Sequence, residues 1–125
     1  MFDPLALLQI AEELGAHPDP DEGHFRSAIN RAYFAMHLKS AWGLEKDGLY
    51  SSKGEAQDHG RVIEVLRTRA KRRGAGERLA ALRRLRERAD YILDDEITSE
   101  TWAEARELVT GVQSQLQLNW DKHSI

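Results

Sequence analysis

The sequence contains no cysteine. The chain can therefore form neither a disulfide framework nor a metal site built on thiolates, and nothing covalent holds its fold together. The first residues, Met1 to Pro4, lack a basic segment, and no apolar run approaches the length of a membrane span. These absences predict a cytoplasmic protein with no signal peptide, no transmembrane helix and no membrane contact.

Proline and glycine are scarce as well, with 3 and 9 copies among 125 residues. With 41% hydrophobic and 31% charged residues, the composition is typical of a folded, helix-rich protein and not of a disordered or collagen-like chain. A chain of this length can bury one hydrophobic core and is too short for two. We therefore expect a single domain over residues 1–125.

The net charge of −3 conceals an asymmetry along the chain. Residues 1–60 carry 5 basic and 10 acidic side chains, residues 61–88 carry 11 and 3, and residues 89–125 carry 2 and 8. The overall charge argues against indiscriminate binding to nucleic acid. The basic middle segment alone can attract phosphate, although a run of charge is more often a solvated helix face.

Apolar residues recur at helical spacing in five segments, and no segment predicts a strand. The segments cover approximately residues 4–15, 21–42, 58–73, 77–94 and 98–116. Asp58 is a suitable capping residue for the third segment, whereas Gly74-Ala75-Gly76 indicates a break and residues 43–57 a long loop. The pattern predicts an all-α, five-helix up-and-down bundle, with most of the core supplied by the second and fourth helices.

The second predicted helix carries a polar stripe among core residues. Its members are Arg26, Asn30, Tyr33 and His37. Their spacing of 4, 3 and 4 residues places them on one helix face. Arg31 lies about 120° round the helix from His37, so these two can meet only on a ligand or across an interface between copies. The stripe is either a site where arginine holds phosphate and histidine moves a proton, or a structural network satisfied within the fold.

The fourth predicted helix adds Arg86, Asp90 and Tyr91. Arg86 and Asp90 stand four residues apart and can pair along the helix, and Tyr91 adds a hydroxyl. Metal chemistry is poorly supported, because the five histidines are scattered and no two of them have a metal-binding spacing with a carboxylate between them. We expect neither a metal ion nor a cofactor.

Three separated stretches together resemble a known family. They are Arg-Ser-Ala-Ile-Asn-Arg-Ala-Tyr-Phe-Ala-Met-His at residues 26–37, Asp-His-Gly at 58–60 and Arg-Glu-Arg-Ala-Asp-Tyr at 86–91. In this order, within about residues 22–118, they are similar to HEPN domains. The bacterial and archaeal branch of that family is marked by an Arg-Ala-Tyr-Tyr-Ala stretch, a His-Gly pair and a later Arg-x-x-Ala-Asp-Tyr.

The resemblance implies a helical bundle, a homodimer and, as in many members, a small nucleotidyltransferase partner with which the protein forms a toxin–antitoxin pair. Active members are metal-independent ribonucleases that use an arginine followed four to six residues later by a histidine at the dimer interface. By this resemblance Arg31 would be the phosphate clamp and His37 the acid–base group. The other candidates for binding RNA or a nucleotide are Arg26, Asn30, Tyr33, His59, Arg86, Asp90 and Tyr91.

Hydrophobic surface also predicts a homodimer. Trp102 and Trp120 on an apolar last helix, together with the alanine-rich second helix, exceed what one small bundle readily covers. The alternative to an enzyme is a non-catalytic helical interaction domain, whose polar stripe serves only dimerisation or contact with a nucleotidyltransferase. A stripe that faces an open cleft favours the enzyme, and a packed, internally satisfied stripe favours the interaction domain.

Overall fold

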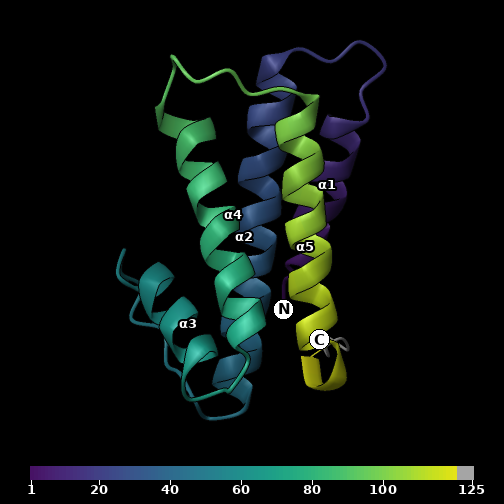
Figure 1. Ribbon diagram of the computed structural model, residues 1–125. Helices are drawn as coiled ribbons and strands as arrows, with labels where there is room; N and C mark the ends of the chain where they lie inside the picture. Colours follow the sequence, from purple (N-terminus) through teal and green to yellow (C-terminus); the bar gives the residue numbers. More distant parts are fainter. Residues whose placement is uncertain (121–125) are drawn as a thin grey trace.

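The computed structural model describes residues 1–120, with side-chain surroundings through residue 116. This part of the chain forms five α-helices and no strand (Figure 1). The helices are α1 (Leu5–Gly15), α2 (Glu22–Lys46), α3 (Asp58–Arg67), α4 (Arg73–Tyr91) and α5 (Ser99–Trp120). The prediction of an all-helical single domain is confirmed, and none of these five helices is long and apolar enough to cross a membrane.

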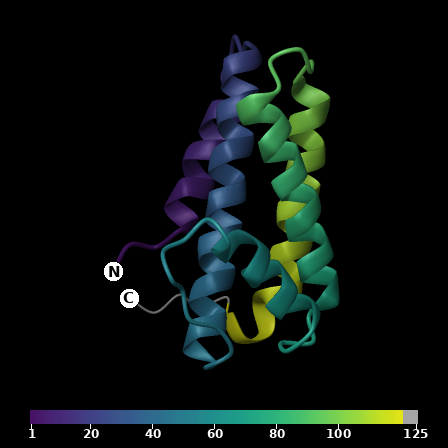
Figure 2. The ribbon, with the colours of Figure 1, turned by 90° about the vertical axis from the view of Figure 1, so that its left-hand side faces the viewer.

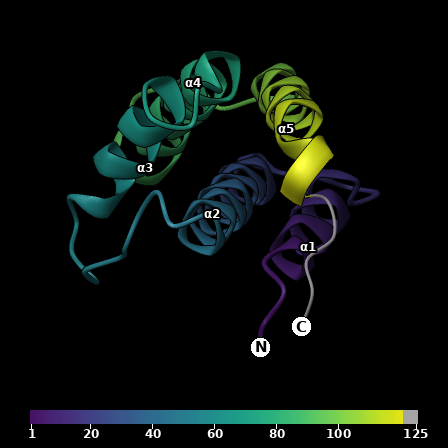
Figure 3. The same cartoon turned by 90° about the horizontal axis from the view of Figure 1, so that it is seen from below.

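The helices α1, α2, α4 and α5 lie alongside one another and alternate in direction (Figures 1 and 2). The short helix α3 packs beside α4, near the end of the bundle where α2 finishes and α4 begins. Seen along the bundle, α2 occupies the middle, with α1 on one side and α3 and α4 on the other (Figure 3). α2 contacts each of the other four helices, so its polar residues meet partners from several elements.

Most of the described core comes from α2 and α4, as predicted. α2 begins where the Asp21 carboxylate accepts a hydrogen bond from the backbone N–H of His24 at 3.2 Å, and its alanines allow neighbouring helices to approach closely. The principal apolar residues that α2 and α4 bury are Ala28, Ile29, Ala32, Met36, Leu79, Leu82 and Leu85.

Four predicted boundaries of α2, α3 and α4 are wrong. α2 continues to Lys46 instead of ending near Trp42, and α3 ends at Arg67 instead of Arg73. α4 covers residues 73–91 instead of 77–94. The chain turns over residues 68–72, where Lys71 adopts a positive φ of 53°. A lysine gives no sign of this conformation in the sequence, because left-handed backbone is normally marked by glycine or asparagine.

The glycines at residues 74 and 76 lie inside the first turns of α4 and do not break a helix. A Cβ atom on Gly76 would lie 2.8 Å from Cγ of Arg67 and 3.1 Å from the carbonyl oxygen of Ile63. Glycine at this position therefore permits the close approach of α3 to α4. The glycine that indicated a break in the sequence instead marks the place where α3 and α4 are in close contact.

Asp58 does not cap α3 as predicted, because it is already the first residue of that helix. Its carboxylate instead accepts hydrogen bonds from the backbone N–H groups of Lys53 and Glu55, at 3.2 and 3.0 Å, and from the Ser52 hydroxyl at 3.1 Å. These contacts tie the loop of residues 47–57 to the start of α3. The loop is four residues shorter at its start than predicted, because α2 is longer.

Trp102 is buried, with 5% of its surface exposed. A Cβ atom on Gly15 would overlap the Trp102 indole, so glycine at the end of α1 makes room for this ring. Trp102 therefore does not contribute the exposed surface from which a dimer was predicted. The side chain of Trp120 lies outside the described part of the structure.

Candidate functional site

Arg26, the first member of the polar stripe, supports the fold. Its guanidinium group donates to the Glu22 carboxylate, 3.0 Å away, and to four backbone carbonyls at 2.6–3.2 Å. The end of a helix leaves such carbonyls without helical partners. Arginine has five N–H donors, and these contacts occupy all of them. The accepting carbonyls, at the end of α4 and just beyond it, belong to Arg88, Ala89, Ile92 and Asp95.

Tyr33, His37 and His59 form an aromatic cluster between α2 and α3. The imidazole rings of His37 and His59 are stacked, with centroids 4.2 Å apart. The Tyr33 hydroxyl lies 2.6 Å from Nδ1 of His59, and the Tyr33 ring is stacked near His37 at 5.9 Å. Tyr33 and His37 are four residues apart on α2, so both rings reach the first turn of α3. Two separated stretches of the sequence are thus in direct contact.

Arg86 of α4 joins the same cluster. Its guanidinium carbon lies 5.2 Å from the centroid of the Phe34 ring and 5.6 Å from those of Tyr33 and Tyr91. At these distances a guanidinium is attracted to the face of an aromatic ring. Arg86 therefore lies between the buried cluster and Tyr91, which is 69% exposed at the end of α4.

Asp90 connects Arg86 to the middle of the polar stripe. Its Oδ2 lies 3.0 Å from Nε of Arg86, which is the ion pair predicted from their spacing, and accepts a hydrogen bond from Nδ2 of Asn30 at 2.9 Å. Oδ1 of Asn30 in turn accepts from Nη1 of Arg31 at 3.0 Å. Most predicted candidates are therefore linked in one network.

Arg31 and His37 do not face each other within one chain. Arg31 is exposed and lines a shallow pocket of about 440 Å³ together with Asp90 and Tyr91. His37 is 7% exposed and lines a different pocket, of about 390 Å³, together with His59. The predicted pairing of Arg31 with His37 therefore needs a second copy, or a ligand that spans both pockets.

Burial keeps the titratable groups of the cluster uncharged. Burial, and after it the neighbouring His59, lowers the pKa of His37 to about 4. Burial, followed by the charges of Arg83 and Arg86, also lowers the pKa of His59. Burial raises the pKa of Tyr33 to about 12. At pH 7 both imidazoles are neutral and the phenol keeps its proton.

These protonation states assign the hydrogen bond between Tyr33 and His59. A phenol O–H is a good donor, and a neutral imidazole has one acceptor nitrogen, so Tyr33 donates to Nδ1 of His59 and the His59 proton lies on Nε2. The resemblance implies an acid–base role for His37, but with a pKa of about 4 the chain alone does not exchange a proton at this ring near neutral pH. Such exchange requires a nearby anion, which would raise the pKa of His37.

No family model, curated protein or solved structure matches this chain. Its chemistry therefore follows from its own geometry. Among residues 1–120, no three histidine, aspartate or glutamate side chains gather in a way that could hold a metal ion. The arrangement offers proton transfer at imidazoles and fixed positive charge from guanidinium groups.

Arg83 is a candidate that sequence reasoning missed. It lies three residues before Arg86 on α4, and its positive charge contributes to the lowered pKa values of both His37 and His59. The three-residue spacing on a helix was the signal that could have shown it. Arg83 and Arg86 add positive charge on the α4 side of the two imidazoles, where it favours an anionic ligand, while the Asp58 carboxylate opposes it from α3.

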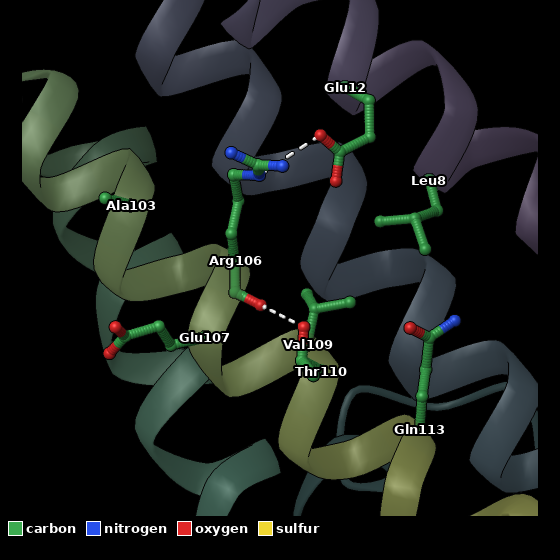
Figure 4. Close-up of a pocket in the computed structure, with 8 residues that line it drawn as sticks. All are labelled: Leu8, Glu12, Ala103, Arg106, Glu107, Val109, Thr110 and Gln113. Atoms are coloured by element: carbon green, nitrogen blue, oxygen red, sulfur yellow. Dashed lines mark hydrogen bonds and ion pairs between the residues drawn. The ribbon is translucent and has the colours of Figure 1, made fainter.

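Another pocket, of about 470 Å³, lies between α1 and α5 (Figure 4). Arg106 of α5 reaches across it to the Glu12 carboxylate of α1, 3.2 Å away, and Leu8 and Val109 line it with apolar surface. Its lining includes no histidine. It therefore lacks a side chain suited to proton transfer near neutral pH.

Proposed function

We propose that this chain is a HEPN-type RNA-interacting protein that cleaves RNA without a metal ion. In this proposal it acts as a homodimer and as the toxin of a two-component module with a nucleotidyltransferase. The supporting observation is the stacking of the His37 and His59 rings, 4.2 Å apart, beside Arg86. The three stretches that carry the HEPN resemblance are far apart in sequence, and their side chains meet in this one cluster.

The proposed chemistry uses the anion that the cluster favours. A phosphate held by Arg86 brings negative charge next to the imidazoles and raises their pKa values toward neutrality. One imidazole, still neutral, then accepts the proton of the ribose 2′-hydroxyl as its oxygen attacks phosphorus and forms a 2′,3′-cyclic phosphate. The bond from phosphorus to the 5′-oxygen breaks, and the other imidazole, protonated beside the phosphate, donates its proton to that oxygen. Arg31 of a second copy supplies the fixed cation that stabilises charge growing on the phosphoryl oxygens.

The test is incubation of the purified protein with a broad panel of RNAs in EDTA. We expect cleavage by the wild-type chain, and a rate lower by about two orders of magnitude in His37→Gln and in Arg31→Ala, with the fold retained. Glu64→Gln, at an exposed position of α3, is the control and should cleave as wild type. An intact RNA panel, or undiminished cleavage by His37→Gln, would remove the catalytic proposal.

The dimer is tested separately by light scattering at micromolar concentration. A mass of 14.2 kDa, that of one chain, would contradict it. Arg31 and His37 would then meet only on a ligand that spans both pockets of one chain.

The non-catalytic interaction domain is the second candidate, and specific observations favour it. The N–H donors of Arg26 bind backbone carbonyls of the chain, and Asn30 forms hydrogen bonds with both Asp90 and Arg31. This half of the stripe is satisfied internally, as expected of a structural network. If no RNA is cleaved or bound, the remaining role for the surface around Arg31 and Tyr91 is to bind a nucleotidyltransferase partner.

A further inference from the structure

The cavity beside His37 has aromatic walls. It measures about 390 Å³ and lies between the second half of α2, the loop of residues 47–57 and the start of α3. Phe34, Trp42 and Tyr50 line it, together with the two imidazoles of the cluster. A cavity with this lining suits a flat aromatic ligand, because stacking on aromatic side chains stabilises any planar ring.

The charged groups that line this cavity accept hydrogen bonds, whereas its hydroxyls and imidazoles can also donate them. Its charged lining residues are three acids, Glu45, Glu55 and Asp58, and its lining contains no arginine or lysine. A phosphate is therefore disfavoured inside the cavity, while a ligand edge rich in N–H donors is favoured.

The three acids differ in the partners that they already have. Arg61 pairs with Glu55 at 3.8 Å and with Asp58 at 3.3 Å. The nearby Tyr50 hydroxyl, and the N–H groups of Glu55 and Lys53, hold the pKa of Asp58 well below its usual range, so this carboxylate is ionised but already occupied. Glu45 is exposed, and its Oε1 accepts the backbone N–H of Ser52 at 3.0 Å. Among the described residues no hydrogen bond to its second oxygen is found, so Glu45 can still accept from a ligand.

His37 adds a buried group whose hydrogen bonding is incomplete. The residue is 7% exposed, and its Nδ1 has no hydrogen-bond partner among the described residues. Buried polar atoms are rarely left in this state in folded proteins, and such exceptions often mark a functional site. This observation is independent of the acids, and it lies in the same cavity lining.

We infer that this cavity takes a nucleobase of the RNA, and specifically guanine. The inference rests on the proposed function and names the base that neighbours the phosphate at Arg86. Guanine presents N1–H and an amino group side by side, and both can donate to a carboxylate such as Glu45. Adenine and cytosine offer an amino group alone on that edge, and uracil offers one N–H between two carbonyl acceptors that a carboxylate repels.

Phe34 places this base subsite next to the phosphate subsite. Its ring lines the cavity, contacts the His59 ring edge-on at 5.7 Å, and lies 5.2 Å from the guanidinium carbon of Arg86. A nucleotide whose base occupies the cavity therefore has its phosphate directed toward His59 and Arg86. In this arrangement the carboxylate of Glu45 selects the base, and the guanidinium group of Arg86 holds the phosphate.

The experiment is calorimetric titration of the full chain with the four 5′-mononucleotides. We expect GMP to bind about tenfold more tightly than UMP, with AMP and CMP between them. Glu45→Gln should reduce this preference to about twofold, because an amide cannot accept both donors of guanine. Glu64→Gln removes the same charge from an exposed position of α3 outside the cavity and should keep the preference.

A second variant tests the aromatic side chains that line the cavity. Tyr50→Leu should weaken all four nucleotides alike, by about five- to tenfold, because stacking does not depend on the identity of the base. Equal binding of the four nucleotides, absence of binding, or binding of tetramethylammonium in place of GMP would each overturn the inference. The last outcome would instead indicate an aromatic cage for a cation.

Failure here is distinguishable from failure of the proposed function. RNA cleavage with no preference for GMP in the titration would leave the ribonuclease in place and exclude the guanine subsite. GMP preference that is lost in Glu45→Gln, in a protein that cleaves no RNA, would support the base subsite and exclude the ribonuclease.

Discussion

The His37 side chain carries a dependence of stability on pH. Its pKa is about 4 in the folded chain, whereas a histidine side chain in water has a pKa of 6.5. The unfolded state therefore binds a proton as the pH falls below 6.5, while the folded state does not until the pH approaches 4. The contribution of a neutral His37 to stability is fully present above pH 6.5 and is lost as the pH falls from 6.5 to about 4.

We therefore expect the free energy of unfolding to fall between pH 7 and pH 5. One proton of this kind is worth about 1.4 kcal/mol per pH unit, which gives a loss of roughly 2 kcal/mol over this interval. Urea unfolding at several pH values measures it. His37→Gln should make the profile less steep, and the remaining slope belongs in part to the partly buried, neutral His59. A wild-type profile that is already flat would contradict the burial of a neutral His37.

Arg26 is the residue whose sequence-based interpretation changes most. Its donors bind carbonyls at the end of α4, so Arg26→Ala should lower the free energy of unfolding by about 2–3 kcal/mol. Arg26→Lys should recover little, because an ammonium lacks the forked donors that reach several carbonyls. Arg31→Ala, at an exposed position, should change stability by less than about 0.5 kcal/mol. Equal effects of Arg26→Ala and Arg31→Ala in urea unfolding would contradict the stabilising role of the hydrogen bonds from Arg26 to the end of α4.

At the scale of elements, the α3–α4 junction gives a paired test. Gly76→Ala should destabilise the chain by about 1–2 kcal/mol, because the added Cβ meets the Ile63 carbonyl oxygen at 3.1 Å. Gly74→Ala meets only the flexible ends of Arg78 and Gln115, so it should be neutral or stabilising by up to about 1 kcal/mol, as for alanine in a helix. Thermal unfolding compares them. If both substitutions had the same effect, glycine would be needed here for flexibility and not for contact.

The same junction shows where sequence reasoning ends. The existence of all five helices followed from apolar periodicity, and the predicted start of the second helix near residue 21 agrees with the start of α2 at Glu22. The boundary between α3 and α4 could not be predicted from the sequence. Gly76 is required by a close contact with α3, and Lys71 adopts a positive φ that is not expected of a lysine. Local signals cannot report a contact with residues elsewhere in the fold.

The candidate site was predictable in part, for the same reason. Periodicity placed Asn30, Tyr33 and His37 on one face, and spacing predicted the Arg86–Asp90 pair. The stacking of His37 on His59 joins two helices and needed the structure. Arg83 was overlooked among the many arginines on α4, because its three-residue spacing from Arg86 is a weak signal and its electrostatic effect on the two imidazoles needed the structure.

At the scale of the whole molecule, positive charge is concentrated in the short segment of residues 61–88 on α3, α4 and the turn between them. Arg72 is a poor probe of this charge, because it donates to the Gln115 carbonyl at 2.8 Å and so supports the fold. Lys71 and Arg73 are exposed beside it and are better suited. We expect Lys71→Ala with Arg73→Ala to weaken RNA binding at every sequence alike.

Salt dependence measures that effect. If both side chains neutralise phosphates, the slope of log affinity against log salt should become less steep by about 1.4 in the double variant, for single-stranded RNA. Glu64→Gln, at an exposed position of α3 within the same segment, is the control. An unchanged slope in the double variant would mean that the basic turn lies away from bound RNA.

The central claim is that the Tyr33–His37–His59–Arg86 cluster receives the phosphate of RNA, and the protonation of His37 reports this most directly. The measurement is an NMR titration of the His37 ring against pH, with and without an oligonucleotide whose 2′-hydroxyl at the cleaved position is replaced by hydrogen. In the free chain the ring should titrate near pH 4, because burial disfavours its charged form. With the oligonucleotide bound, the phosphate should raise the pKa of His37 toward neutrality. An unchanged pKa of His37 in a saturated complex would contradict the account.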